Sequence, residues 1–177
     1  MEKDHIDRFL EKLAELPGLD LEVEGIVDRV NGIARRVKRE LESTLSEFDL
    51  THGEWHVLGK LRLGADPHRM SPGELAEALE LSSGAMTNRI DRLEAAGFVR
   101  RSPDPNDRRG VQVELTAEGL QIYEQTVSAQ ARKEALIAGA LTKAEQRQLN
   151  DLLRKIMLEL EQREGWVRGK AKEKPTA

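Results

Sequence analysis

Apolar side chains recur every three or four residues along both ends of the chain, the spacing of an amphipathic α-helix. Residues 23–48 hold nine such positions, which predicts a helix of roughly 25 residues, against an average of about 11–12 in globular proteins. A shorter helix over residues 6–16 precedes it and ends at Pro17 and Gly18. Two more helices are expected over residues 117–138 and from about residue 143. Such long apolar stripes can pack on a partner chain as readily as on their own.

Helix starts are marked by capping boxes, in which a hydroxyl side chain precedes a glutamate by three residues. The two side chains can then satisfy each other's backbone N–H groups. Thr116 can cap the helix that follows it. The three capping boxes are Thr51 with Glu54, Ser71 with Glu74, and Thr142 with Glu145.

The centre of the chain predicts a helix-turn-helix followed by a β-hairpin. Two short helices, with Leu81 in the turn between them, are followed by "FVRRS", a loop and the alternating strand "VQVEL". The expected fold class is therefore mainly α with a small two-stranded β wing, a winged helix-turn-helix. The inner positions of the two helices are Leu75, Ala76, Leu79, Met86, Ile90 and Leu93.

Composition excludes several classes of protein. The 177 residues contain no cysteine, which rules out a disulfide framework and a thiolate zinc site. The acidic, amphipathic N-terminus is unlike a signal peptide, and no apolar run of about 18 residues exists, so a cytoplasmic protein with no membrane partner is expected. No nucleophile–histidine–carboxylate order, phosphate-binding glycine loop or dinucleotide motif occurs. We therefore expect no enzyme, no catalytic residues and no cofactor.

Charge is distributed unevenly along the chain. The formal net charge is −4, and residues 1–50 carry 8 basic against 13 acidic side chains. Residues 82–109 instead hold six arginines against four acids. A locally basic face can bind phosphate on an acidic protein, because screening confines surface charge effects to about 8–10 Å.

The polar face of the second central helix is the first candidate for DNA contact. Short polar side chains, a glycine and arginines at a helix N-terminus suit the major groove of double-stranded DNA. The alternative is an ordinary polar helix face. The candidate residues are Ser82, Ser83, Gly84, Thr87, Asn88, Arg89 and Arg92.

The tip of the hairpin is the second candidate. Arg108 and Arg109 follow Asp107 in the loop, where a guanidinium can enter a narrow minor groove while the aspartate holds it by charge-assisted hydrogen bonds. The alternative is a solvated turn. Arg100 and Arg101 flank the first strand, and a structural ion pair and a phosphate contact are equally open for them.

Residues 20–165 resemble the MarR family of bacterial transcription regulators. The resemblance rests on "ELAEALELSSGAMTNRIDRLEAAGFVRR" and on the wing "DRRGVQVELTAEG", which fits the family pattern D-x-R-x-x-x-V-x-L-T. It implies a homodimer, most often a repressor, whose two winged helices bind a palindrome, with Arg109 in the minor groove braced by Asp107. The domains implied are residues 1–50 and 117–165 for dimerisation and 51–116 for DNA binding, with a disordered tail over 166–177.

Many members of this family release DNA when a small, often aromatic or anionic, ligand binds between the dimerisation and DNA-binding regions. The candidates for such an effector site are His56, Trp55, Arg36 and Arg39, although for Trp55, at a helix start, a place in the core is the stronger expectation. His52, His56 and Glu54 could also hold zinc, but their order is not that of a zinc protease, and no metal site is expected. Without cysteine, thiol oxidation cannot be the signal.

A different class of function stays open. A winged helix can act as a protein-interaction module that has lost DNA binding. Such a module is expected to lack arginine in the wing and in the second central helix, whereas this chain keeps it in both. A salt-dependent interaction with a palindromic duplex distinguishes the two.

Overall fold

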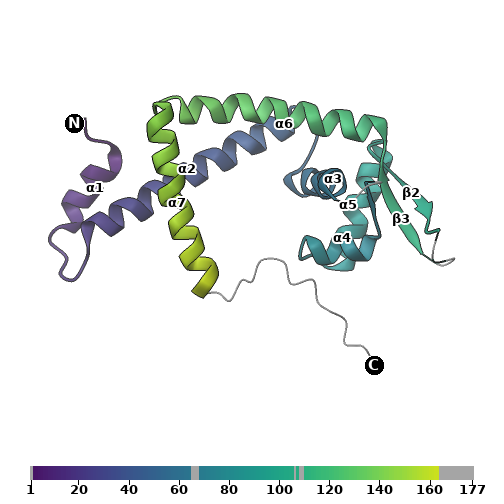
Figure 1. The fold of residues 1–177 in the computed structure, drawn as a ribbon, viewed down its shortest axis with the longest axis horizontal. Helices are drawn as coiled ribbons and strands as arrows, with labels where there is room; N and C mark the ends of the chain where they lie inside the picture. Colours follow the sequence, from purple (N-terminus) through teal and green to yellow (C-terminus); the bar gives the residue numbers. More distant parts are fainter. Residues whose placement is uncertain (1, 65–67, 106, 108–109, 164–177) are drawn as a thin grey trace. The chain divides into compact units, whose positions relative to one another are not determined.

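The computed structural model describes residues 2–64, 68–105, 107 and 110–163, which form seven helices and three strands (Figure 1). The chain divides into two compact units, residues 1–133 and 134–177. The mainly helical fold with a small sheet confirms the predicted class, whereas the predicted domain limits stay a prediction and the tail over 166–177 lies outside the described residues. The elements are α1 (His5–Leu13), α2 (Leu21–Ser46), α3 (His52–Leu63), β1 (Arg69–Met70), α4 (Pro72–Ala78), α5 (Ser83–Ala95), β2 (Val99–Pro103), β3 (Val111–Leu115), α6 (Ala117–Ala138) and α7 (Lys143–Arg163).

The predicted caps all form. In the capping box of α3, the Thr51 N–H donates to Glu54 Oε2 at 2.8 Å and the Glu54 N–H donates to Thr51 Oγ1 at 3.3 Å. The boxes at Ser71 and Thr142 close in the same way. The Gly119 N–H donates to Thr116 Oγ1 at 2.9 Å, so this threonine caps α6. Local sequence therefore sets where these helices begin.

One hydrophobic core holds α3, α4, α5 and the hairpin together. The predicted inner side chains of α4 and α5 are buried, apart from Leu79, which is partly buried against the same core. The start of α6 closes one side through partly buried Ile122 and Tyr123. This core fixes the orientation of α5. Its fully buried side chains include Leu58, Leu61, Leu75, Met86, Ile90, Leu93, Val99 and Val113.

The wing is a three-stranded antiparallel sheet in the order β1–β3–β2, one strand more than predicted. β2 pairs with β3 in the register Val99 to Leu115, and β1 adds only Arg69 and Met70 on the other side of β3. The two residues of β1 are too few for any alternation to appear in the sequence. In Figure 1, β2 and β3 lie side by side and extend away from the helices.

The first helix packs on the second through an ion-pair cluster. The Arg29 guanidinium donates to Asp4 Oδ2 at 3.0 Å and to Asp7 Oδ1 at 2.6 Å, and Ile6 is buried beside them. The Asp7 N–H bond and, after it, the Arg29 bond lower the pKa of Asp4 to about 2. The predicted N-terminal helix is thus present, although it ends at Leu13 rather than at residue 16.

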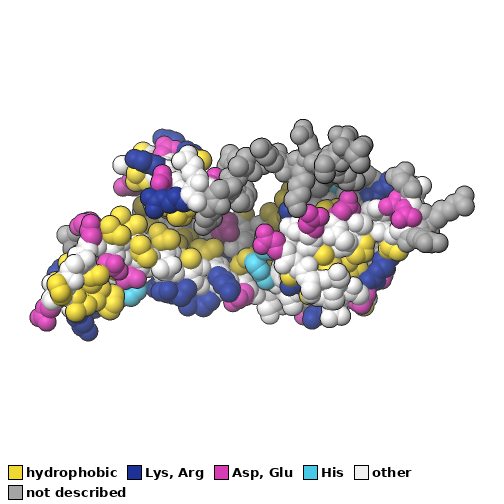
Figure 2. All heavy atoms as spheres, turned by 90° about the horizontal axis from the view of Figure 1, so that it is seen from below, with side chains coloured by type: hydrophobic (Ala, Val, Ile, Leu, Met, Phe, Trp, Pro, Cys, Tyr) yellow, Lys and Arg dark blue, Asp and Glu magenta, His cyan; other side chains and the backbone are white. Residues whose placement is uncertain are grey.

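Large apolar side chains lie exposed along α2 and α7. Figure 2 shows such side chains gathered over α1 and α2. No residue of α7 is buried, and no helix in the described part of the chain is long and apolar enough to cross a membrane. The side chains at least 39% exposed are Val23, Ile26, Val27, Val30 and Ile33 on α2, and Leu149, Leu152, Leu153, Ile156, Met157, Leu158 and Leu160 on α7.

Candidate nucleic-acid interface and adjacent pocket

Helix α5 presents a small polar surface at its N-terminal end. Ser82 is the N-cap, accepting the Ala85 N–H at 3.3 Å, and Ser83, Thr87 and Asn88 are exposed. A Cβ at Gly84 would meet no atom within 4 Å, so the surface is open there. Because Met86 and Ile90 are fully buried on the opposite face, the polar face is fixed outward, as a groove-binding helix requires.

The two arginines of α5 lie against the first turn of α3. Arg92 forms an ion pair with Glu54, with Arg92 Nε 2.8 Å from Glu54 Oε1. The Arg89 guanidinium covers Gly53 so closely that a Cβ on this glycine would lie 2.5 Å from Arg89 Cζ. The sequence grouped both arginines with the outward face, and the structure adds that α3 holds them. Their contact with DNA stays a prediction.

The arginines of β2 form ion pairs. Arg100 donates to Glu114 Oε2 through Nε at 3.0 Å and Nη2 at 2.8 Å. Hydrogen bonds from Ser102 and then Arg100 lower the pKa of Glu114. Arg101 pairs with Asp91 and Glu94 of α5. Of the two interpretations left open for these arginines, the structure supports the structural ion pair, which reduces the positive charge available to phosphate.

The wing tip is only partly described. The Gly110 N–H donates to the Asp107 carbonyl oxygen at 2.9 Å, and the Asp104 N–H donates to the Gly110 carbonyl oxygen at 3.0 Å. These bonds close the base of the loop. Arg108 and Arg109 lie outside the described residues, so their role and the brace from Asp107 stay predictions.

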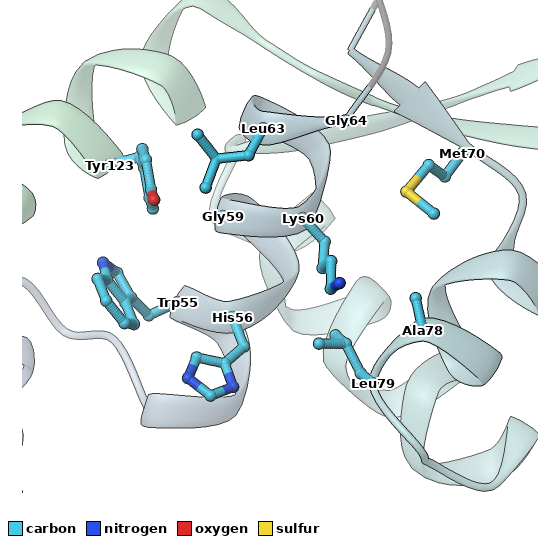
Figure 3. Close-up of a pocket in the computed structure, with 10 residues that line it drawn as sticks. All are labelled: Trp55, His56, Gly59, Lys60, Leu63, Gly64, Met70, Ala78, Leu79 and Tyr123. Atoms are coloured by element: carbon cyan, nitrogen blue, oxygen red, sulfur yellow. The ribbon is translucent and has the colours of Figure 1, made fainter. Parts of the chain in front are cut away.

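A pocket of about 560 Å³ lies beside α3 (Figure 3). Trp55 and Tyr123 stack at one side, with ring centroids 6.0 Å apart and an interplanar angle of 30°. Trp55 Nε1 is buried with no hydrogen-bond partner among the described residues. A mostly apolar cavity with a few polar groups is the usual form of a small-molecule site. Its lining residues are Trp55, His56, Gly59, Lys60, Leu63, Gly64, Met70, Ala78, Leu79 and Tyr123.

The basic side chains of the pocket are His56 and Lys60. Burial, and then the positive charges of His52, Arg89 and Lys60, lower the pKa of His56. The rings of His52 and His56 lie 4.1 Å apart between centroids. No group of three potential metal ligands occurs among the described residues.

Two of the four predicted effector residues meet in this pocket. Trp55 and His56 line it, whereas Arg36 and Arg39 are exposed on α2 and do not. Arg36 Nη1 instead donates to the carbonyl oxygen of Gly32 in its own helix. Sequence reasoning missed Lys60 and Tyr123 as lining residues.

A signal for the pocket was present in the sequence of α3. Trp55, Gly59 and Leu63 follow one another at four-residue spacing and therefore share one face of this helix. The missing side chain of Gly59 leaves room there, since a Cβ would lie 3.3 Å from the Tyr123 ring. The first turn of α3 thus contacts α5 through Glu54 and lines the pocket through Trp55 and His56.

Comparison with known proteins gives consistent matches. The model of the MarR family matches residues 50–111, the segment from α3 to the start of β3. The HTH-type transcriptional regulator PecS of Dickeya dadantii (strain 3937) is 31% identical over 142 residues, which are 80% of this chain and 86% of PecS.

Solved structures of MarR from E. coli also resemble this chain. The wild-type apo form is 34% identical, with a TM-score of 0.61 over 73% of this chain and 94% of that one. A mutant complexed with operator DNA is 33% identical, with a TM-score of 0.58 over 76% of this chain and 95% of that one.

Proposed function

Because the chain belongs to the MarR family of transcriptional regulators, we propose that it is a homodimeric repressor that binds a pseudo-palindromic DNA operator. The family is non-enzymatic, and its named relatives are transcriptional regulators. The observation that carries the proposal is the outward polar face of α5, fixed by the buried Met86 and Ile90. The similar E. coli mutant complexed with operator DNA supports the same use of this fold.

In this proposal α5 enters the major groove. Ser83, Thr87 and Asn88 face the base edges, and Gly84 allows the backbone to approach closely. Arg108 and Arg109 of the wing enter the adjacent minor groove, with Asp107 as the brace. Base contacts then set the sequence preference, while the wing adds affinity that depends on groove shape and charge.

The dimer is supported by the exposed apolar faces. α2 and α7 carry twelve of the large apolar side chains left exposed in the described part of the chain. Permanent dimer interfaces bury upward of about 2,000 Å², and long helices with such faces can supply this area. A two-fold axis then places two copies of α5 in successive major grooves, with half-sites about 10 bp apart.

The pocket beside α3 is proposed to hold an effector that releases the DNA. Stacked Trp55 and Tyr123 offer an aromatic surface, the unpartnered Trp55 N–H offers a donor, Lys60 offers positive charge, and the His56 imidazole offers a further hydrogen-bonding group. An aromatic anion satisfies all of these groups together.

Arginine variants test DNA binding. With an operator selected by the protein from random duplexes, we expect Arg89→Ala to lose roughly 1–3 kcal/mol of discrimination at one position per half-site. Arg109→Ala is expected to weaken binding to operator and scrambled DNA alike, and to flatten the log–log salt slope by about 0.9 for each phosphate that the side chain no longer neutralises. Asp107→Ala is expected to have part of this effect. Fluorescence anisotropy at three salt concentrations measures all three.

The outcome separates the two classes of function. Binding of a palindromic duplex that weakens with salt supports the regulator. If the wild-type protein binds no duplex at low salt, the protein-interaction module becomes the better hypothesis. An Arg109→Ala protein with unchanged affinity and slope would identify the wing arginines as a solvated turn.

Ligand screening tests the effector site. Aromatic carboxylates that raise the unfolding temperature are expected to weaken operator binding through a coupling of about 1–3 kcal/mol. Trp55→Phe, which keeps the ring and removes the N–H, and His56→Ala are both expected to weaken the ligand. Arg36→Ala is the matched control, because Arg36 lies outside the pocket. A ligand that binds all three variants like the wild type must occupy another site.

A further inference from the structure

Glu54 is a buried carboxylate with both oxygens in use. Its side chain is 5% exposed. Oε2 accepts the Thr51 N–H at 2.8 Å and the Thr51 hydroxyl at 2.6 Å, and Oε1 forms an ion pair with Arg92, 2.8 Å from its Nε. A buried carboxylate is tolerated only with a cation or several donors, so the pair with Arg92 accounts for its burial.

The other glutamate capping boxes show that capping alone does not require this arrangement. Glu74 and Glu145 likewise accept the backbone N–H of their cap residues at the starts of α4 and α7, and both are exposed. No arginine pairs with either of them in the described part of the chain. Capping a helix therefore does not require the burial of Glu54 or its pairing with an arginine.

Among the described residues, Glu54 is the carboxylate paired with Arg92, and it meets one edge of the guanidinium. The Arg92 side chain is 67% exposed, and Nε is the nitrogen that meets Glu54. A guanidinium has five N–H donors in a rigid plane, so holding Nε fixes the plane while the two terminal nitrogens keep their donors. Arg92 follows Asn88 by four residues and therefore lies on the same exposed side of α5.

We propose that Glu54 is a positioning residue, which holds Arg92 by Nε so that its terminal nitrogens donate to a phosphate of the DNA backbone. The inference rests on the proposed function and adds that different turns of α5 contact different parts of the DNA. Residues of the first two turns face the bases, and Arg92 in the third turn fixes the helix on the backbone. Phosphate contacts of this kind set the register in which base edges are contacted.

Arg89, the other arginine of α5, lies beside the same turn of α3 and can be compared with Arg92. Arg89 covers Gly53 in the same turn of α3, but no carboxylate pairs with it among the described residues. Glu54 thus selects Arg92 alone. Charge by itself does not explain the pairing, because Arg89 lies as close to the start of α3.

A double-mutant cycle on the full chain tests the proposal. Arg92→Ala is expected to weaken operator binding roughly tenfold, the value of one charge-assisted hydrogen bond, and to flatten the salt slope by about 0.9. Glu54→Gln keeps a carbonyl oxygen for the Thr51 N–H and is expected to weaken binding by a few fold with the slope unchanged, since the charge of Arg92 remains. The double variant is expected to bind no more weakly than Arg92→Ala alone.

Two further variants separate positioning from folding and from charge. Glu74→Gln, in the capping box of α4, is the matched control and should leave operator binding unchanged. Arg92→Lys keeps the charge but lacks the planar fork, so we expect weaker operator binding with the wild-type salt slope. Unfolding midpoints of all variants establish that they are folded at the temperature of the binding measurement.

The contrary outcomes are distinct. Tighter binding by Glu54→Gln would mean that Glu54 competes with the phosphate for Arg92, and would overturn the proposal. So would an equal loss from Glu54→Gln in the wild-type and Arg92→Ala backgrounds, because Glu54 would then act without Arg92. If the wild-type protein binds no duplex, the proposed function fails and this inference fails with it.

Discussion

Gly119→Ala is expected to unfold the winged helix-turn-helix at temperatures where the wild-type protein stays folded. A Cβ on Gly119 would lie 1.9 Å from the Phe98 carbonyl oxygen and 2.8 Å from its carbonyl carbon. These are backbone atoms, which cannot turn aside as a side chain can. The start of α6 must therefore move away from the segment that joins α5 to β2.

That movement breaks several bonds at once. The Thr116 hydroxyl donates to the Gly97 carbonyl oxygen at 2.7 Å, and the Thr116 N–H donates to the Phe98 carbonyl oxygen at 3.1 Å. Overpacking costs about 1–3 kcal/mol, and loss of the Thr116 cap adds about 0.5–2 kcal/mol. We expect a loss of about 3 kcal/mol or more, a large part of a typical stability of about 5–15 kcal/mol.

Thermal and urea unfolding followed by circular dichroism measure this effect. Gly73→Ala is the matched control, because a Cβ there meets only Ser71 Oγ, at 3.9 Å. Its stability should change by no more than about 1 kcal/mol, the difference in helix propensity between the two residues. Equal midpoints for the two variants would show that α6 adjusts at no cost.

Much of this fold could be predicted because the signals are local. Helical periodicity located α2, α6 and α7, and the capping boxes at Thr51, Ser71 and Thr142 located helix starts. The alternation of residues 111–115 predicted β3. β1 could not be predicted, because two residues carry no period and their partners on β3, Glu114 and Val113, lie more than forty residues away in sequence.

The site was less accessible to sequence reasoning, because its contacts join distant segments. The sequence around Glu54 predicts only its capping box with Thr51. No pattern in the sequence indicates that the second carboxylate oxygen pairs with Arg92. The pocket likewise brings Lys60 of α3 together with Tyr123 of α6, more than sixty residues apart in sequence. Trp55 and His56, named from the sequence, do line this pocket, while their part in effector binding stays a prediction.

Leu153→Glu combined with Ile156→Glu is expected to dissociate the proposed dimer. These side chains are 39% and 46% exposed in the single chain and lie with Leu149 and Leu160 on one face of α7. A 21-residue helix with no buried side chain gains little stability from its own chain, so its apolar face needs a partner. Two carboxylates on that face would have to be buried without cations when the chains meet.

The consequence for DNA binding is expected to be larger than that of any single arginine. A dimer binds its second half-site as an intramolecular event, which raises overall affinity by about 10²–10⁴. The double variant should therefore lose most of its affinity for the full operator while binding an isolated half-site as the wild type does. Sedimentation should show a 19.9 kDa monomer in place of a dimer.

The control for this prediction is a double variant with the same added negative charge, placed away from the apolar face of α7. Gln148→Glu with Gln162→Glu adds the same two carboxylates at exposed polar positions and should remain dimeric with wild-type operator affinity. If both double variants lose operator affinity equally, repulsion between added carboxylates and DNA explains the loss, and the apolar face does not. If the wild-type protein itself sediments as a stable folded monomer at micromolar concentration, the exposed faces of α2 and α7 serve something other than a second copy of this chain.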